Sequence, residues 1–131
     1  MRVIFSVYID FDENEFDKNG DLNKNIKNKK RFKDNYNFLK SFQEKYAQRL
    51  GIDYILYEND DSWKQYKKYF ENNHSYISKY NIVNFYKIKL MYDLAKTYDE
   101  ILYLDFDVVP LTNDNIFDSI DFSNGIALSL I

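Results

Sequence analysis

The residues with the clearest chemical potential are two aspartates, Asp105 and Asp107, at the end of the apolar run ILYLDFDVVP (residues 101–110). The run is rich in β-branched and aromatic residues, and therefore predicts a short buried strand. Successive side chains of a strand point to opposite faces, so we expect both carboxylates on one side and Phe106 in the packing. Two adjacent carboxylates repel each other unless a cation neutralises them. The pattern favours a metal site; the alternative is a plain transition from strand to loop.

The chemistry of carboxylate oxygens narrows the choice of metal. Mg²⁺ and Mn²⁺ prefer oxygen ligands, and proteins usually hold them with one or two carboxylates plus the phosphates of a substrate. We therefore expect Asp105 and Asp107 to bind Mn²⁺ or Mg²⁺ as a bridge to a phosphate or pyrophosphate. There the cation would neutralise the charge that develops on a phosphate leaving group.

The periodicity of apolar residues predicts the elements that position these aspartates. Apolar runs predict strands over residues 2–10, 52–60 and 101–110, and the start of another over 125–131. Stripes at helical spacing predict helices over residues 34–50, 62–73 and 81–98, and a short one within 113–120. Strands that alternate with helices form a mostly parallel sheet covered by helices on both faces. We therefore expect one α/β domain over residues 1–131.

Residue types also predict the helix ends and faces. We expect Asp34 to cap the helix over 34–50, Gly51 to end it, and Asp61 or Ser62 to cap the next helix. The buried stripe of the helix over 81–98 is predicted to comprise Phe85, Ile88, Tyr92 and Ala95, widened by Met91 and Leu94.

The segment over residues 11–33 is polar, lacks a period and holds seven of the 18 basic residues. This composition predicts a solvated Lys- and Asn-rich loop. The alternative is a basic flap over an anionic substrate.

Acidic residues lie at or just past the ends of three predicted strands, and they are Asp10, Glu58, Asp60, Asp61, Asp105 and Asp107. In open parallel sheets, ligands bind outside the carboxyl ends of the strands. We therefore expect these acids to meet at one edge of the sheet and form a site there.

Bulk composition excludes several other classes of protein. The net charge of −3 provides no basic field for nucleic acid. The chain has no cysteine, so disulfides are excluded. It has no apolar run long enough to span a membrane, and MRVIFSVYIDFD lacks the features of a signal peptide. We therefore expect no transmembrane segment and a cytoplasmic location.

The segment KIKLMYDLAKTYDEILYLDFDVVP (residues 87–110) resembles the GT-A glycosyltransferases of the nucleotide-diphospho-sugar transferase superfamily. It is most similar to the retaining branch that includes glycogenin and the bacterial lipopolysaccharide galactosyltransferases, which carry Tyr-Leu-Asp-x-Asp-Val-Val after a helix and an acidic turn. The likeness covers residues 81–131 well and the first two strands more loosely. It does not extend to residues 11–33.

The resemblance implies a GT-A (Rossmann-like) fold and transfer of a sugar from a nucleotide-diphosphate donor, most simply a UDP-sugar, to a glycan, protein or lipid acceptor. It implies that Asp105 and Asp107 hold Mn²⁺ or Mg²⁺ on the donor diphosphate, that Asp105 also reaches the ribose, and that Phe106 lies against the donor. Lys87, with Lys89 as the alternative, would assist the phosphates. The resemblance also implies that Ser6, Tyr8 and Asp10 surround the nucleobase of the sugar donor. Tyr8 would stack on uracil, and Asp10 would accept from its N–H.

The chain also departs from the family, because residues 108–131 hold no histidine to act as the usual third metal ligand. It is therefore either part of a longer enzyme or a minimal form, and a degenerate nucleotide-sugar-binding domain without turnover is the alternative function. A haloacid-dehalogenase-like phosphatase, which would form a phosphoaspartate on Asp105, is a weaker alternative because its Asp-x-Asp follows the first strand.

Overall fold

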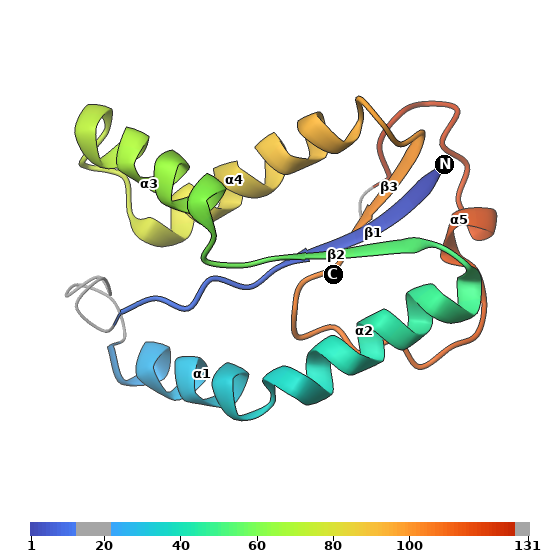
Figure 1. Ribbon diagram of the computed structural model, residues 1–131, viewed down its shortest axis with the longest axis horizontal. Helices are drawn as coiled ribbons and strands as arrows, with labels where there is room; N and C mark the ends of the chain where they lie inside the picture. The colour runs from blue at the N-terminus through green and yellow to red at the C-terminus, as the bar shows by residue number, and fades with distance from the viewer. Residues whose placement is uncertain (13–21, 128–131) are drawn as a thin grey trace.

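A computed structural model describes residues 1–12 and 22–127. Its sheet contains β1 (Arg2–Val7), β2 (Asp53–Tyr57) and β3 (Glu100–Tyr103) in the order β2-β1-β3, and all pairs are parallel (Figure 1). This confirms the predicted α/β fold with a parallel sheet. The central strand β1 is buried from Val3 to Val7, as expected for a continuous apolar run that is covered on both faces.

Helices cover both faces of the sheet (Figure 1). The elements between the strands are α1 (Leu22–Asp34), α2 (Tyr36–Leu50), α3 (Asp61–Asn73) and α4 (Lys79–Leu94), and α5 (Ile116–Ser119) follows β3. On one face, Ile4 of β1 packs with Tyr46 of α2 and Phe117 of α5. On the other face, Val3, Phe5 and Val7 pack against α3 and α4. The alternation of β1 side chains therefore builds two cores from one strand.

The predicted loop over residues 11–33 is wrong for its second half, because residues 22–34 form α1. This helix buries no residue, and its apolar side chains are only Leu22, Ile26 and Phe32, too few for sequence periodicity to detect it. Its lysines and Arg31 are nevertheless good helix formers. Residues 13–21 of the predicted loop lie outside the described residues.

The helix ends differ from their prediction in two places. Asp34 is the last residue of α1 rather than the cap of α2, and Asn35 at the junction donates to the Arg31 carbonyl. Asp60, rather than Asp61 or Ser62, caps α3 by accepting from the Trp63 N–H at 2.9 Å. Gly51 ends α2 with φ of 66°, in the left-handed conformation predicted for it.

The predicted strands are longer than the observed ones. β2 ends at Tyr57 and β3 at Tyr103, so the acids that follow them lie in turns or caps. In the strand expected over 125–131, residues 125–127 are exposed and not in a strand, and residues 128–131 lie outside the described part of the chain.

The buried face of α4 was predicted wrongly except at Leu94. The buried residues are Ile82, Tyr86, Leu90 and Leu94, whereas Phe85, Ile88, Met91 and Tyr92 are exposed. Both faces of this helix carry apolar side chains, so periodicity alone could not choose between them. The choice depends on α3, since the Tyr86 ring packs against Trp63 and its hydroxyl donates to Ser62 Oγ at 3.1 Å.

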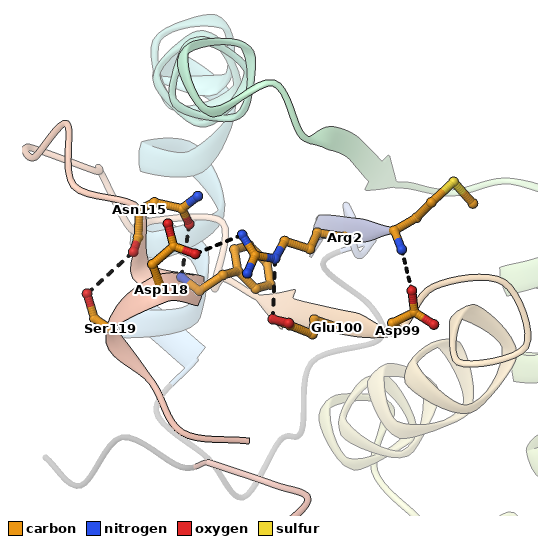
Figure 2. A network of polar contacts seen from close by, with 8 residues as sticks. Arg2, Asp99, Glu100, Asn115, Asp118 and Ser119 are labelled. Carbon is orange, nitrogen blue, oxygen red and sulfur yellow. Dashed lines mark hydrogen bonds and ion pairs between the residues drawn. The ribbon is translucent and has the colours of Figure 1, made fainter. Parts of the chain in front are cut away.

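A polar network ties the start of β1 to β3 and α5 (Figure 2). The Arg2 guanidinium lies 3.4 Å from Glu100 of β3 and 3.0 Å from Asp118 of α5, and it covers the Phe117 ring. The amino group of Met1 contacts Asp99 just before β3. These contacts fix the beginning of β3, the strand that leads to Asp105 and Asp107.

Within residues 1–12 and 22–127, no helix is long and apolar enough to cross a membrane.

The observed burial of α4 predicts opposite results for two neighbouring truncations. Leu90→Ala removes a side chain that is 3% exposed and should lower the free energy of unfolding by about 2–4 kcal/mol. Ile88→Ala, at a side chain that is 62% exposed, should change it by less than about 0.5 kcal/mol. Urea denaturation of both variants measures the difference, and equal losses would contradict the assignment of the buried face.

Candidate functional site

A cavity of about 240 Å³ lies beyond the carboxyl ends of β1 and β3. Its walls come from the segment after β1, from α1, from α4 and from the segment after β3. In Figure 1 the segment after β1 runs between α1 and the α3–α4 pair. Six of the seven residues predicted to form the site line this cavity, and they are Tyr8, Asp10, Lys87, Asp105, Phe106 and Asp107.

Asp105 and Asp107 lie in a turn rather than at the end of a strand. Strand β3 stops at Tyr103, although the Leu104 N–H still donates to the Phe5 carbonyl at 3.0 Å. The Val108 N–H then donates to the Asp105 carbonyl at 2.9 Å, which closes the turn. Both aspartates are exposed while Phe106 is 4% exposed, so the predicted alternation of the side chains is confirmed.

Phe106 anchors the turn in an aromatic cluster. Its ring stacks on Tyr8 with a centroid distance of 4.8 Å and lies 5.7 Å from Tyr36 and 6.2 Å from Phe32. Burial raises the pKa of Tyr8, and burial followed by a hydrogen bond to Glu58 raises the pKa of Tyr36 to about 12. Both tyrosines are therefore neutral at physiological pH, and the cluster joins β1, α1, α2 and the turn.

Gln43 of α2 holds the backbone of the turn. Its side-chain amide is completely buried and donates to the carbonyls of Asp105 and Val108 at 2.9 Å each, with Phe106 O at 3.4 Å. Its own carbonyl accepts from the Tyr54 hydroxyl at 2.7 Å. The prediction missed this residue, although a glutamine between Leu39 and Tyr46 on a buried helix face signals a required polar contact.

Two donors converge on one oxygen of Asp105. The Tyr103 hydroxyl donates to Asp105 Oδ1 at 2.6 Å, and the Lys87 ammonium lies 3.3 Å from the same atom and 5.0 Å from the Tyr103 ring centroid. Burial, then the hydrogen bond to Asp105 and the charges of Asp105 and Asp107, raise the pKa of Tyr103. Tyr103 therefore stays protonated as a donor. Lys89, the alternative to Lys87, pairs with Asp93 at 2.6 Å instead.

Asp10 is the third carboxylate of the cavity. Its Oδ1 accepts from Lys29 of α1 at 2.9 Å, and Asn59 contacts its backbone N–H and carbonyl at 2.9 and 3.1 Å. The acids after β2 do not join it in the cavity, which contradicts the prediction that all three strands contribute. Asp60 instead caps α3, and its neighbour Asn59 forms hydrogen bonds with the backbone of Asp10.

Ser6 does not belong to the site. Its side chain is 0% exposed and does not line the cavity, so the prediction that it contacts a nucleobase is wrong for this conformation. Its buried Oγ has no hydrogen-bond partner in the described structure.

The donor set can be tested against a divalent metal. Among the described residues, no group of three or more His, Asp, Glu or Cys side chains is arranged to hold an ion. Asp105 and Asp107 instead offer hard oxygen ligands that are exposed to the cavity. Two carboxylates suit Mg²⁺ or Mn²⁺ when phosphate oxygens and water complete the coordination. They do not suit a metal that needs a complete protein cage.

The role of Gln43 predicts a strong effect of a substitution that preserves its size. Gln43→Leu leaves the Tyr54 hydroxyl and the turn carbonyls without their partner, and should lower the free energy of unfolding by about 2–3 kcal/mol. Gln48→Leu is the matched control, because Gln48 is exposed on the same helix. Urea denaturation measures both, and a Gln43→Leu variant as stable as Gln48→Leu would contradict this role.

In comparisons with known proteins, no family model, no curated protein and no solved structure matches this chain. The resemblance to GT-A glycosyltransferases therefore stays a hypothesis that depends on the ILYLDFDVVP segment. What supports a function is the geometry of the cavity, in which Asp10, Lys87, Asp105 and Asp107 meet at the carboxyl edge of a parallel sheet.

Proposed function

We propose that this protein binds a nucleotide-diphosphate sugar, most simply a UDP-sugar, with Mn²⁺ or Mg²⁺, and transfers the sugar to a glycan, protein or lipid acceptor. The observation that carries the proposal is the turn after β3. It presents Asp105 and Asp107 to a cavity at the carboxyl edge of the parallel sheet while Phe106 and Gln43 hold it in place. Ligands of such sheets bind at this edge.

Four residues of the cavity have a polar role in the proposed reaction. Asp105 and Asp107 would hold the cation, which supplies Lewis-acid stabilisation of the diphosphate leaving group. Tyr103 orients Asp105 by donating to Oδ1, so the other carboxylate oxygen is available to a ligand. Lys87, which lies beside Asp105, is placed to bind a phosphate oxygen.

The apolar part of the cavity supports binding of the nucleoside. Phe106 lines it as the resemblance implies, but the Tyr8 ring already stacks on Phe106. A uracil ring could therefore use only the remaining surface of Tyr8, which is half-buried. Asp10 lies next to Tyr8 along the same segment, and its carboxylate is placed to accept from a nucleobase N–H.

The alternatives predict different outcomes for the same protein. A degenerate domain would bind UDP in a metal-dependent manner without transferring or hydrolysing the sugar. A phosphatase would form a phosphoaspartate on Asp105, which mass spectrometry would detect.

The proposed function predicts that the two aspartates are required for binding of metal and donor together. Asp105→Asn and Asp107→Asn should each weaken Mn²⁺-dependent binding of UDP by at least about tenfold, because each removes a charged ligand of the cation. Isothermal titration calorimetry with UDP, with and without Mn²⁺, measures this loss.

A matched control is Asp114→Asn, which removes the same charge at an exposed position outside the cavity. It should bind UDP with Mn²⁺ like the parent, and circular dichroism should show the same fold in all three variants. Parent-like binding by Asp105→Asn or Asp107→Asn would refute the metal site. No binding of UDP by the parent would refute the proposed function.

A further inference from the structure

Helix α1 forms one wall of the cavity, although its sequence lies outside the resemblance to known glycosyltransferases. The residues that face the cavity are Asn25, Asn28, Lys29 and Phe32. They are spaced by three and four residues, so they share one side of the helix. The other basic residues of α1 are all exposed and outside the cavity: Lys24, Lys27, Lys30, Arg31 and Lys33. Lys29 is therefore the one cation that α1 brings to the site.

Lys29 is held by the segment that follows β1. Its ammonium lies 2.9 Å from Asp10 Oδ1 and also donates to the Phe11 carbonyl. On α4, Lys87 pairs with Asp105 at 3.3 Å. The side chains of Lys29 and Lys87 are 23% and 21% exposed, so most of each side chain is buried. The cavity thus contains two ion pairs of the same kind, one from each helix wall.

This arrangement suits exchange of partners with a metal diphosphate. Three carboxylates and two lysines line the cavity, so its own charges nearly cancel. A divalent cation would be coordinated by carboxylate oxygens. The two phosphoryl groups of a diphosphate would accept hydrogen bonds from both lysines. A lysine ammonium has three donors on a flexible stem, so it can turn from a carboxylate to a phosphate without movement of the backbone.

We propose that α1 is part of the donor site, and that Lys29 exchanges Asp10 for a phosphate oxygen of a nucleoside diphosphate when the ligand binds. The exchange also releases Asp10 Oδ1 to accept a hydrogen bond from the nucleobase. The ligand is therefore one that carries a diphosphate anion and a hydrogen-bond donor together. This inference rests on the proposed function and adds a phosphate-binding residue from a segment that the resemblance does not cover.

Two charge-matched variants of α1 test the exchange. Lys29→Met should weaken binding of UDP with Mn²⁺ by about tenfold, the loss of one charge-assisted bond to phosphate. Lys30→Met removes the same charge from the adjacent exposed position and should stay within about twofold of the parent. Lys29→Arg keeps the charge and should recover much of the affinity. Calorimetry measures all three.

A second probe separates phosphate binding from a purely structural role of the ion pair. Manganese pyrophosphate has no nucleobase, so only the phosphate contacts remain. Lys29→Met should lose affinity for it, whereas Asp10→Asn, which breaks the same ion pair but keeps the lysine, should bind it at least as tightly as the parent. Equal losses in the two variants would mean that the pair only supports α1, and would overturn the proposal.

The outcomes also separate this inference from the proposed function. If the parent binds UDP with Mn²⁺ and Lys29→Met binds it like Lys30→Met, the exchange is wrong while the donor site stands. If the parent does not bind UDP at all, the proposed function is refuted and the exchange with it.

Discussion

Parallel pairing of the buried strand β1 with both of its neighbours is the constraint on which the site depends. The register places Phe5 opposite Tyr103, and continuing it by three residues brings Tyr8 opposite Phe106. The two rings stack at 4.8 Å although neither residue lies in a strand. The same alignment brings Asp10 and Asp105 into one cavity. The register of the strands therefore determines which side chains lie close together beyond the strand ends.

The turn after β3 depends on a second interaction, because leaving the sheet removes the strand partners of its backbone. Buried carbonyls must then find other donors. Gln43 supplies them for Asp105 and Val108, and it is itself held by the Tyr54 hydroxyl of β2. A network that spans α2, β2 and the turn thus fixes the backbone while the carboxylates of Asp105 and Asp107 remain exposed to the cavity. Rigid backbone and accessible ligands are what a metal-binding turn requires.

Sequence patterns predicted the parts of this structure in which one physical signal acts alone. The apolar run of β1 and the alternation around Phe106 were predicted correctly, because burial on both faces and a period of two leave clear patterns. The buried face of α4 could not be predicted, since Tyr86 and Phe85 compete and only contact with Trp63 decides between them. Helix α1 was missed because it buries nothing. Lys29 of this helix belongs to the site because it forms an ion pair, and an ion pair leaves no periodic pattern in the sequence.

The proposed binding of a metal and a nucleoside diphosphate must satisfy the charges of the cavity. Asp105 is neutralised by Lys87 and Asp10 by Lys29, so the acids are stable in the folded protein before any ligand arrives. A diphosphate alone would have to displace carboxylates from these lysines and would leave three unpaired acids beside its own negative charge. A cation alone would compete with Lys87, which is already bound to Asp105, one of its two proposed ligands. In the proposed complex the cation binds Asp105 and Asp107, the diphosphate binds the two lysines, and Asp10 accepts from the nucleobase, so each group that loses a partner gains another. If the proposed ligands bind here, the charges of the cavity therefore favour binding of the metal and the diphosphate together over binding of either one alone.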